Sequence, residues 1–502
     1  MSHPLNITSS RLQRRTLLRG ALAVAACSAS PLRTARAAPA VNNAGAKIEL
    51  TEAQLADLQK SIKGTVILPS SPTYAEERRV WSPAFDRKPA LIVKATSTKD
   101  VQAAVQFARA HDILTAVRCG GHSYAGFSVV DDGMVIDLKL LNGVTVDPKK
   151  KTAHVAGGAL LGNLDRATAP HKLATTAGVV SHTGVGGLAT GGGQGRLGRK
   201  FGLTCDNNLG VEMVLADGSI VRANAKENPD LYWAVRGGGG NFGIVTDFEF
   251  QLHEYDGIIT SLSYAFPSAK AKDLMKVYAD LSASAPLELS MSSSLRTSDR
   301  GETTCSISGT FLGRKAAAEA AVKAVASLGA PINTRIEEMD YVTLQAVADG
   351  SMFSSYFGYS RYSYLRQIDP KLVDLVLDYV LRANTPRTSV SFGAQGGAIA
   401  KVKETATAFA ERDGIYQCAV ATNWKPGEDP AAGQRHVREL WAMIDPMSTG
   451  GFYINELYDD PEERIRKSFH GNYARLVDIK TKVDPTNFFH LNPNIKPKGR
   501  TL

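Results

Sequence analysis

The chain has 502 residues, of which 43% are hydrophobic and 21% charged, a composition typical of a soluble globular protein with two or more domains. Its formal net charge is +9, but residues 1–37 contain six arginines and no acidic residue. The rest of the chain holds 52 basic against 49 acidic residues, a balance of +3. This balance excludes binding to nucleic acid or to another polyanion as the main function.

Residues 1–37 have the layout of a secretory signal peptide. Arg14-Arg15 precede an apolar run, and the small-residue site Ala35-Arg36-Ala37 follows it. The paired arginines favour the twin-arginine export machinery, with an ordinary Sec signal as the alternative, and predict a periplasmic or secreted protein. Anchoring as a lipoprotein through Cys27 is a further alternative. No later apolar run approaches the ~20 residues of a membrane span.

Four cysteines follow this segment, namely Cys119, Cys205, Cys305 and Cys418. They are far apart, with no CxxC motif and no clustered histidines, which argues against a zinc site or any other metal site. An oxidising compartment would permit a disulfide, but the spacing assigns none.

The first part of the chain predicts a leader, one helix and then an α+β domain. Residues 38–84 read as a flexible leader followed by a helix that Thr51 caps, with Gln54 reaching back to it. Residues 85–257 form a domain unusually dense in glycine, in which Ser97 caps a second helix. Its expected strands are 91–96, 113–118, 134–138, 144–148 and 152–158.

The second part, residues 258–445, predicts an antiparallel sheet with helices on one face. Residues 307–313 and 416–424 read as strands. The expected helices are 268–284, 314–328, 369–384 and 429–444. The last segment, residues 446–502, is rich in aromatic residues and asparagine.

Three glycine-rich stretches lie within about 130 residues of one another, at 118–123, 184–195 and 236–243. Bare backbone at the end of a strand brings N–H groups against an anion, usually a phosphate. Three such stretches predict one long ligand that contains a pyrophosphate. Although GVGGLA at 184–189 matches G-x-G-x-x-G/A, further glycines follow it and no parallel βαβ unit frames it, so we reject a nicotinamide site.

Four motifs in order resemble a known family. RCGGHSYAGFSV, VSHTGVGGLATGGGQGRLGRKFGLTCDNNLG, LYWAVRGGGGNFGIVTDFEF and GNYARLVDIKTKVDPTNFFHLNPNIKP are similar to the FAD-linked oxidases of the berberine bridge enzyme type, within the vanillyl-alcohol-oxidase group. The likeness extends from about residue 80 to the end of the chain. It implies a two-lobed FAD-binding domain of the PCMH type (residues 85–257), a substrate domain (258–445) and a C-terminal segment (446–502) that returns to the FAD domain.

The resemblance implies a flavin bound covalently through His122, which holds the histidine position of the motif R-x-G-G-H-[ST]. The alternative is a histidine that only hydrogen-bonds the cofactor. Val180 stands where many members have a second attachment through cysteine, so we predict one covalent bond. The other expected FAD contacts are Arg118, Cys119, Gly120, Gly121, Ser123, Gly126, Thr183, Gly184, Gly186, Gly187, Gly191, Gly192, Gly193, Gly195, Gly243, Val245 and Asn487.

The resemblance also implies a tyrosine base, because Tyr453-Ile-Asn455 matches the motif Y-x-N of the family. A tyrosine with an ordinary pKa of about 10 needs stabilisation as phenolate to act as a base, and a tyrosine that only packs on the flavin is the alternative. His182 is either a proton relay or substrate contact, or a hydrogen-bonded histidine behind the site. Gln194 stands where plant members often have a second tyrosine.

Two further groups are weaker candidates for the substrate pocket. Tyr356, Tyr359, Tyr362 and Tyr364 cluster in SSYFGYSRYSYLR and could stack on an aromatic or sugar substrate, although core packing explains most such clusters. Gln395 and Gln417 lie on expected strands and could face the pocket.

The activity that follows is an oxidase acting on a small molecule, with molecular oxygen reduced to hydrogen peroxide. One alternative is a flavin dehydrogenase with another electron acceptor, and another is a non-enzymatic binding protein that keeps the flavin fold. Alcohols, sugars, phenolic alcohols and cyclic amines all suit this chemistry, and the sequence does not distinguish among these substrate classes. It does not predict the oligomeric state either.

Overall fold

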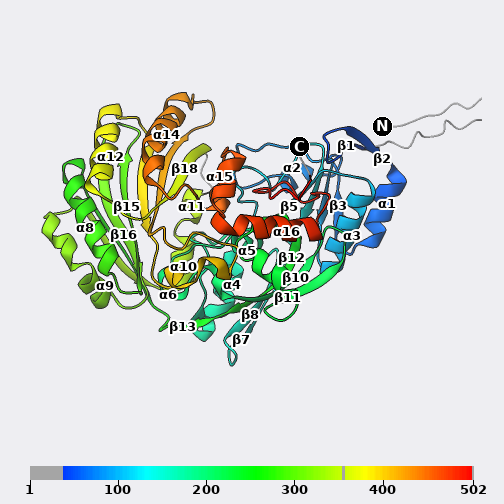
Figure 1. The fold of residues 1–502 in the computed structure, drawn as a ribbon, viewed down its shortest axis with the longest axis horizontal. Helices are drawn as coiled ribbons and strands as arrows, with labels where there is room; N and C mark the ends of the chain where they lie inside the picture. The colour runs from blue at the N-terminus through cyan, green and yellow to red at the C-terminus, as the bar shows by residue number, and fades with distance from the viewer. Residues whose placement is uncertain (1–37, 353–356, 500–502) are drawn as a thin grey trace, which may run out of the picture.

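The computed structural model describes residues 38–352 and 357–499, which form two lobes side by side (Figure 1). We use N-terminal lobe for residues 38–257, second lobe for residues 258–445 and C-terminal segment for residues 446–499. The expected signal peptide, with its paired arginines and Cys27, lies outside the described residues, and so does Tyr356. Within the described ranges, no helix is both long and apolar enough to cross a membrane.

The N-terminal lobe begins with a small sheet that leads to the first glycine-rich stretch. Its four strands run in the order β3-β4-β6-β5, with β4, β6 and β5 parallel. The expected caps are confirmed, because Thr51 and Gln54 form a capping box and Ser97 accepts from the backbone N–H of Asp100. The elements are β3 (Thr65–Ile67), β4 (Leu91–Lys94), β5 (Thr115–Arg118), β6 (Met134–Asp137), α1 (Glu52–Ser61), α2 (Tyr74–Glu77) and α3 (Thr98–Ala110).

Residues 38–50 differ from the expected flexible leader. They form a hairpin of β1 (Ala38–Val41) and β2 (Lys47–Leu50), and the N–H of Val41 donates to the carbonyl of Asp132. Ala40 and Leu50 are buried in the same apolar cluster as α1 and α3. Short strands with few apolar residues carry little periodicity, which is why the sequence did not predict them.

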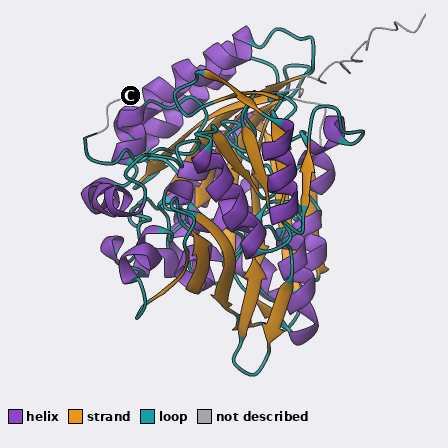
Figure 2. Cartoon of the chain, turned by 90° about the vertical axis from the view of Figure 1, so that its right-hand side faces the viewer, coloured by secondary structure: helices purple, strands orange, loops and turns teal. Residues whose placement is uncertain are grey.

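A second sheet of the N-terminal lobe is antiparallel, with the strand order β11-β10-β12-β8-β7. Figure 2, with this lobe toward the viewer, shows strands running through its centre and helices outside them. The strands are β7 (Val144–Asp147), β8 (Thr152–Ala156), β10 (Asn208–Val214), β11 (Ile220–Asn224) and β12 (Ile244–Gln251), beside the pair β9 (Leu173–Ala174) and β13 (His253–Glu254). The helices are α4 (Leu161–Thr168), α5 (Val185–Thr190), α6 (Gly198–Phe201) and α7 (Pro229–Ala234).

The second lobe is a seven-stranded antiparallel sheet in the order β17-β14-β16-β15-β19-β20-β18. As predicted, helices cover one of its faces (Figure 1). The strands are β14 (Ile259–Pro267), β15 (Leu289–Thr297), β16 (Thr303–Phe311), β17 (Asn333–Met339), β18 (Phe357–Leu365), β19 (Thr388–Ala394) and β20 (Tyr416–Trp424). The helices are α8 (Ala271–Ser284), α9 (Lys315–Ala321), α12 (Pro370–Ala383) and α14 (Ala431–Ile444), with the shorter α10 (Tyr341–Ala346), α11 (Asp349–Met352) and α13 (Ala398–Lys401) elsewhere.

The C-terminal segment packs against the N-terminal lobe. It contains α15 (Glu462–Lys467) and α16 (Tyr473–Val483), drawn in red in Figure 1. Phe452, Ile454 and Leu476 share one buried cluster with Val155 and Phe248 of the second sheet. This packing fixes the residues just before α15 between the two lobes.

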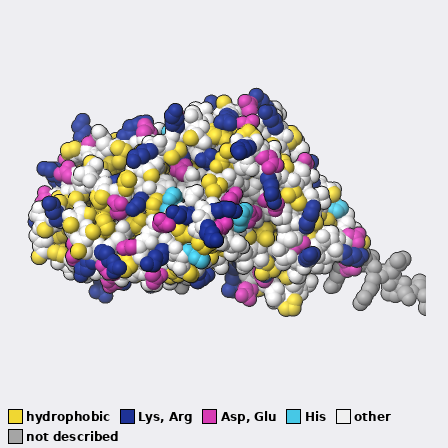
Figure 3. All heavy atoms as spheres, turned by 90° about the horizontal axis from the view of Figure 1, so that it is seen from below, with side chains coloured by type: hydrophobic (Ala, Val, Ile, Leu, Met, Phe, Trp, Pro, Cys, Tyr) yellow, Lys and Arg dark blue, Asp and Glu magenta, His cyan; other side chains and the backbone are white. Residues whose placement is uncertain are grey.

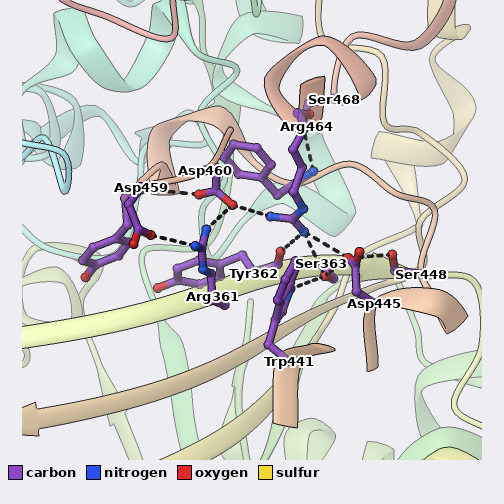
Figure 4. A network of polar contacts seen from close by, with 12 residues as sticks. Arg361, Tyr362, Ser363, Trp441, Asp445, Ser448, Asp459, Asp460, Arg464 and Ser468 are labelled. Carbon is purple, nitrogen blue, oxygen red and sulfur yellow. Dashed lines mark hydrogen bonds and ion pairs between the residues drawn. The ribbon is translucent and has the colours of Figure 1, made fainter. Parts of the chain in front are cut away.

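A buried ionic network joins the C-terminal segment to the second lobe (Figure 4). The Asp460 carboxylate lies 2.6 Å from a guanidinium nitrogen of Arg361 on β18 and 2.7 Å from one of Arg464 on α15. Arg464 also lies over the ring of Trp441 on α14. The side chain of Asp460 is 3% exposed and that of its neighbour Asp459 is 51% exposed, so water screens Asp459 and not Asp460.

We expect Asp460→Asn to lower the free energy of unfolding by about 3–5 kcal/mol, because it removes the buried carboxylate that two buried guanidinium groups share and leaves them only the more exposed Asp459 and Asp445. Asp459→Asn should lower it by about 1 kcal/mol or less, since exposed ion pairs contribute little. Equilibrium urea denaturation of the two variants checks the difference. Equal effects would show that the network does not hold the segment.

Candidate active site

A cavity of about 790 Å³ lies where the two lobes and the C-terminal segment meet. All three glycine-rich stretches line it, together with one face of the second-lobe sheet and residues 453–457. Segments more than 300 residues apart in sequence therefore converge on one space. The cavity is large enough for a dinucleotide together with a small substrate.

Glycine is required where the first two stretches touch. A Cβ atom on Gly120 would lie 2.3 Å from the backbone nitrogen of Gly184, and one on Gly184 would lie 2.5 Å from the sulfur of Cys119. A Cβ on Gly186 would lie 2.5 Å from the carbonyl oxygen of Gly157. Real side chains do not fit at such distances, so these loops pack against one another through bare backbone and form a glycine-lined cradle at the cavity wall. This cradle suits the phosphates of a dinucleotide.

His122 lies at the end of this cradle and lines the cavity. Its ring stacks on Trp81 with 5.1 Å between centroids, and its Nε2 lies 2.7 Å from Nδ1 of His182. Burial lowers the pKa of His122 to about 3, and repulsion from His182 adds to the effect. His122 is therefore a neutral imidazole at physiological pH, which is the form that can act as a nucleophile.

His182 does not line the cavity, and its Nδ1 lies against the ring of His122, which does. Burial is the main cause that lowers the pKa of His182, and the Asp349 carboxylate opposes it. Of the two interpretations of His182, this position favours the hydrogen-bonded histidine behind the site over a direct substrate contact.

Tyr453 lines the cavity on the opposite side, with its side chain nearly buried. Three N–H donors point at its phenolic oxygen, from the backbone of Gly193 (2.9 Å), the backbone of Gln194 (3.2 Å) and the side-chain amide of Asn455 (2.7 Å). The same amide donates to the carbonyl of Leu188, which fixes its orientation. Burial raises the pKa of Tyr453, and these hydrogen bonds oppose the rise.

A neutral phenol accepts two hydrogen bonds at most while it donates its own proton, whereas a phenolate accepts three. The geometry around Tyr453 is therefore matched to the ionised side chain. Gly193, expected at the cofactor, instead supplies one of these donors. The neighbouring Gly191 packs against Asn455, because a Cβ there would lie 2.1 Å from the amide oxygen.

The cavity contains most, though not all, of the residues expected at the cofactor and the base. Those that line it are Cys119, Gly120, Gly121, His122, Ser123, Thr183, Gly184, Gly186, Gly187, Gly195, Gly243, Val245, Tyr453 and Asn455. Those that do not are Arg118, Gly126, His182, Gly191, Gly192, Gly193 and Asn487.

The residues outside the cavity have other partners. Arg118 is fully buried, with its guanidinium 2.6 Å from the Asp137 carboxylate, so it holds the loop that leads to His122. Gly126 packs on Phe85, and Gly192 packs on Phe409. Asn487 adopts a left-handed backbone conformation in the C-terminal segment.

The tyrosine cluster does not form the expected stacking surface among the described residues. Tyr359 points toward the helices and donates to the Asp459 carboxylate. Tyr364 is buried, and its hydroxyl accepts from the Gln194 side chain at 2.5 Å. Neither Tyr364 nor Tyr362 lines the cavity. Gln395 and Gln417 do line it, although only Gln417 lies on a strand, since β19 ends at Ala394.

Sequence reasoning missed Glu456, which lines the cavity directly after Asn455. One of its oxygens accepts a hydrogen bond from the side-chain amide of Gln417. Burial raises the pKa of the Glu456 carboxyl well above its ordinary value. No other carboxylate lines the cavity in the described part of the chain. The one sequence signal that could have pointed to Glu456 is its position directly after the Y-x-N motif.

The cysteines remain thiols among the described residues. Cys119 lines the cavity, its sulfur lies 3.5 Å from the carbonyl of Ala159, and burial raises its pKa to about 11. Val180, in the position of a second attachment, also lines the cavity. Within the described ranges no group of histidine, cysteine and acidic residues is arranged to hold a metal ion.

Comparison with known proteins identifies the family. The family model described as "FAD binding domain" matches residues 89–224, and that described as "Berberine and berberine like" matches residues 452–496. An uncharacterized FAD-linked oxidoreductase of Bacillus subtilis, YgaK, is 30% identical over 462 residues, covering 88% of this chain and 98% of that protein.

Two oxidases are also similar to this chain. The (R)-6-hydroxynicotine oxidase of Paenarthrobacter nicotinovorans is 27% identical over 450 residues, covering 88% of this chain and 98% of that protein. The solved xylooligosaccharide oxidase of Myceliophthora thermophila, in complex with xylobiose, superposes with a TM-score of 0.80 at 25% identity, covering 89% of this chain and all of that one. The resemblance seen in the sequence and the expected α+β fold are both confirmed. The chain thus belongs to the berberine bridge enzyme-like FAD-linked oxidoreductases, and FAD is the cofactor for which its glycine-lined cavity is built.

Proposed function

We propose that this protein is an exported oxidase that carries FAD through a single covalent bond at His122. It oxidises a C–H bond of a small organic substrate, with molecular oxygen as the electron acceptor and hydrogen peroxide as the product. The observation that carries the proposal is the placement of a neutral His122 and a triply hydrogen-bonded Tyr453 on one cavity. Export is supported by the paired arginines and apolar run of residues 1–37 alone.

The residues of the cavity fit FAD in three respects. Gly187 and Gly240 line the cavity, and a Cβ on either would meet no protein atom within 4 Å, so the bare backbone there leaves room for close approach of a pyrophosphate. The neutral His122 side chain is able to form a bond to the flavin ring, and Val180 offers no second nucleophile. When bound, FAD accepts a hydride from the substrate and passes the electrons on to oxygen.

Tyr453 removes the proton that must leave the substrate oxygen or nitrogen as the hydride departs from carbon. Its three N–H donors stabilise the phenolate that performs this step. Gly193, Gln194 and Asn455 thus offset part of the burial that disfavours the phenolate, although the pKa of Tyr453 stays raised.

We expect His122→Ala to release its flavin on acid denaturation, because no covalent bond would remain. Cys119→Ala, a matched change of another nucleophile on the same cavity, should keep acid-stable flavin. Flavin fluorescence of the denatured protein on a gel measures both. Acid-stable flavin in His122→Ala would show that the attachment lies elsewhere.

We expect Tyr453→Phe to reduce kcat by about 10²- to 10⁴-fold, the usual contribution of a general base. In the wild type, kcat/KM should rise with pH as the phenol loses its proton, and the raised pKa of Tyr453 places that rise on the alkaline side. Stopped-flow reduction of the flavin across pH measures this. Tyr458→Phe, in the same segment but outside the cavity, serves as the control. A pH rise that persists in Tyr453→Phe would assign the base to another group.

The choice of electron acceptor is tested separately. We expect one hydrogen peroxide per substrate oxidised in air, and turnover that stops without oxygen. Peroxide and substrate are measured together, with and without an artificial acceptor. Turnover that needs the artificial acceptor even in air would identify a dehydrogenase.

A further inference from the structure

Among the described residues, the guanidinium of Arg196 lines the cavity and has no carboxylate to balance its charge. Arg196 directly follows the second glycine-rich stretch, between α5 and α6, and is half-buried. Its Nε donates to the side-chain oxygen of Gln345 at 3.1 Å, and a terminal nitrogen donates to the carbonyl of Val179 at 3.2 Å. Both acceptors are neutral, so the contacts orient the guanidinium without neutralising it.

The surroundings of Arg196 hold its side chain in place. Gln345, on α10 of the second lobe, is fully buried, and its amide donates to the carbonyl of Ala177 at 2.7 Å, which leaves its oxygen for Arg196. Gly178 and Gly195 form a parallel β-bridge, which keeps the two loops around Arg196 side by side. A guanidinium has five N–H donors, and the two contacts use two of them. The others are left for a ligand in the cavity.

The rest of the described lining does not supply the missing negative charge. Burial raises the pKa of both Glu456 and Tyr453, which disfavours their charged forms. Arg335, on β17, is a second cation of the lining, but its guanidinium lies 2.8 Å from the Glu337 carboxylate. The serines that β14, β15 and β16 present to the cavity are neutral. The charge of Arg196 is therefore left unbalanced.

A carboxyl group behind the cavity wall does not neutralise Arg196 either. Asp165, on α4, is buried and hydrogen-bonded to Gln345, and burial raises its pKa well above the ordinary value. Burial also raises the pKa of Tyr341, which keeps this neighbouring phenol uncharged. Burial lowers the pKa of Arg196 itself, as expected for a cation that lacks a counter-ion. A ligand with a negative charge would remove this penalty.

Arg196 also lies close to the proposed base. Gln194, two residues earlier, donates its backbone N–H to the phenolic oxygen of Tyr453 at 3.2 Å. Two residues of extended chain span at most about 7 Å, so Gln194 and Arg196 belong to one small part of the lining. The bare backbone that suits the phosphates of FAD lies elsewhere, at Gly187 in α5 and at Gly240 after α7. The charge of Arg196 thus faces the substrate end of the cavity.

We propose that the substrate carries a carboxylate, which the guanidinium of Arg196 binds while the reacting carbon lies at Tyr453. This inference rests on the proposed oxidase function and narrows its substrate class. A guanidinium binds a carboxylate through two parallel N–H···O bonds. A carboxylate carries one negative charge, as a single unbalanced guanidinium requires, whereas a phosphate monoester carries nearly two.

The carboxylate orients the substrate and is unchanged by the reaction. At the reacting carbon the C–H bond breaks and its hydride passes to the flavin. The O–H or N–H bond beside it breaks as well, and its proton passes to Tyr453. A C=O or C=N double bond forms, and oxygen takes up two electrons and two protons to give hydrogen peroxide.

Anion binding is tested first, because it needs no turnover. The visible spectrum of the flavin in the holoenzyme is titrated with propionate, benzoate and phenylacetate, and with the neutral amide of each. We expect at least one carboxylate to change the spectrum and to bind about 10-fold or more tightly than its amide, since hydrogen bonds between ionised groups are the stronger ones. Amides that bind as tightly as their carboxylates, or carboxylates that leave the spectrum unchanged, overturn the inference. Tighter binding of phenyl phosphate than of benzoate overturns the choice of a carboxylate.

The role of Arg196 is tested with two variants and a matched control. Arg196→Gln should weaken binding of the active carboxylate about 10- to 100-fold and leave binding of its amide unchanged, while Arg196→Lys restores part of the loss. Arg335→Gln removes a guanidinium that is already paired with Glu337 and should weaken binding about 2-fold or less. Every variant should keep its full content of FAD. Loss of FAD from Arg196→Gln would assign this arginine to the cofactor, and an equal effect of Arg335→Gln would contradict a specific site.

Turnover is tested by anaerobic reduction of the flavin with pairs of compounds that differ by a carboxylate. The pairs are 4-(hydroxymethyl)benzoate with benzyl alcohol, D-glucuronate with D-glucose, and N-methylproline with N-methylpyrrolidine. We expect the carboxylate to reduce the flavin faster than its neutral partner in at least one pair, and the neutral partner to be faster in none. Faster reduction by a neutral partner overturns the inference and leaves the oxidase standing. If the carboxylates bind but dithionite alone reduces the flavin, the proposed oxidase fails and the anion site at Arg196 stands.

Discussion

At Gly120 and Gly184 two loops meet backbone to backbone, and the geometry of the whole cavity depends on this contact. No side chain fits between them, since a Cβ on either residue would overlap the other loop. The contact brings the strand end that carries His122 against the start of α5. The glycine-rich backbone of the N-terminal lobe forms one wall of the cavity. The second lobe and the C-terminal segment form the other walls.

The C-terminal segment completes the site from the other side. Tyr453 receives its hydrogen bonds from Gly193 and Gln194, about 260 residues earlier in the chain. A few residues later, Asp460 is paired with Arg361 of the second lobe and with Arg464 of α15 (Figure 4). Tyr453 is thus hydrogen-bonded to one lobe, while the segment that carries it is also paired with the other. Basic and acidic side chains are interspersed on the face drawn in Figure 3, which agrees with the nearly balanced charge after residue 37.

Much of the fold was predictable because its signals are local. A few neighbouring residues determine the helix caps at Thr51 and Ser97 and the alternating strand at 416–424. His122 and Tyr453 could be singled out because each belongs to a short motif, and both line the cavity. Arg118 was expected at the cofactor because an arginine beside a glycine-rich loop resembles a phosphate ligand, and only the tertiary structure shows its buried pairing with Asp137. Glu456 and the serines of β14, β15 and β16 belong to no motif. The place of the serines depends on strand register, and that of Glu456 on the packing of the C-terminal segment, neither of which a single sequence gives.

Along β14, β15 and β16, side chains that pack against the helices alternate with side chains that line the cavity. Core packing and ligand contact are therefore carried by different residues. Leu295 and Ile307 are buried between the sheet and its helices, whereas Ser292 and Ser308 on the same strands line the cavity. Changes at the cavity-facing positions therefore leave the packed core intact. A family built on this sheet can diverge in ligand preference by point substitution along a few strands, at little expense to folding, while its glycine contacts stay fixed.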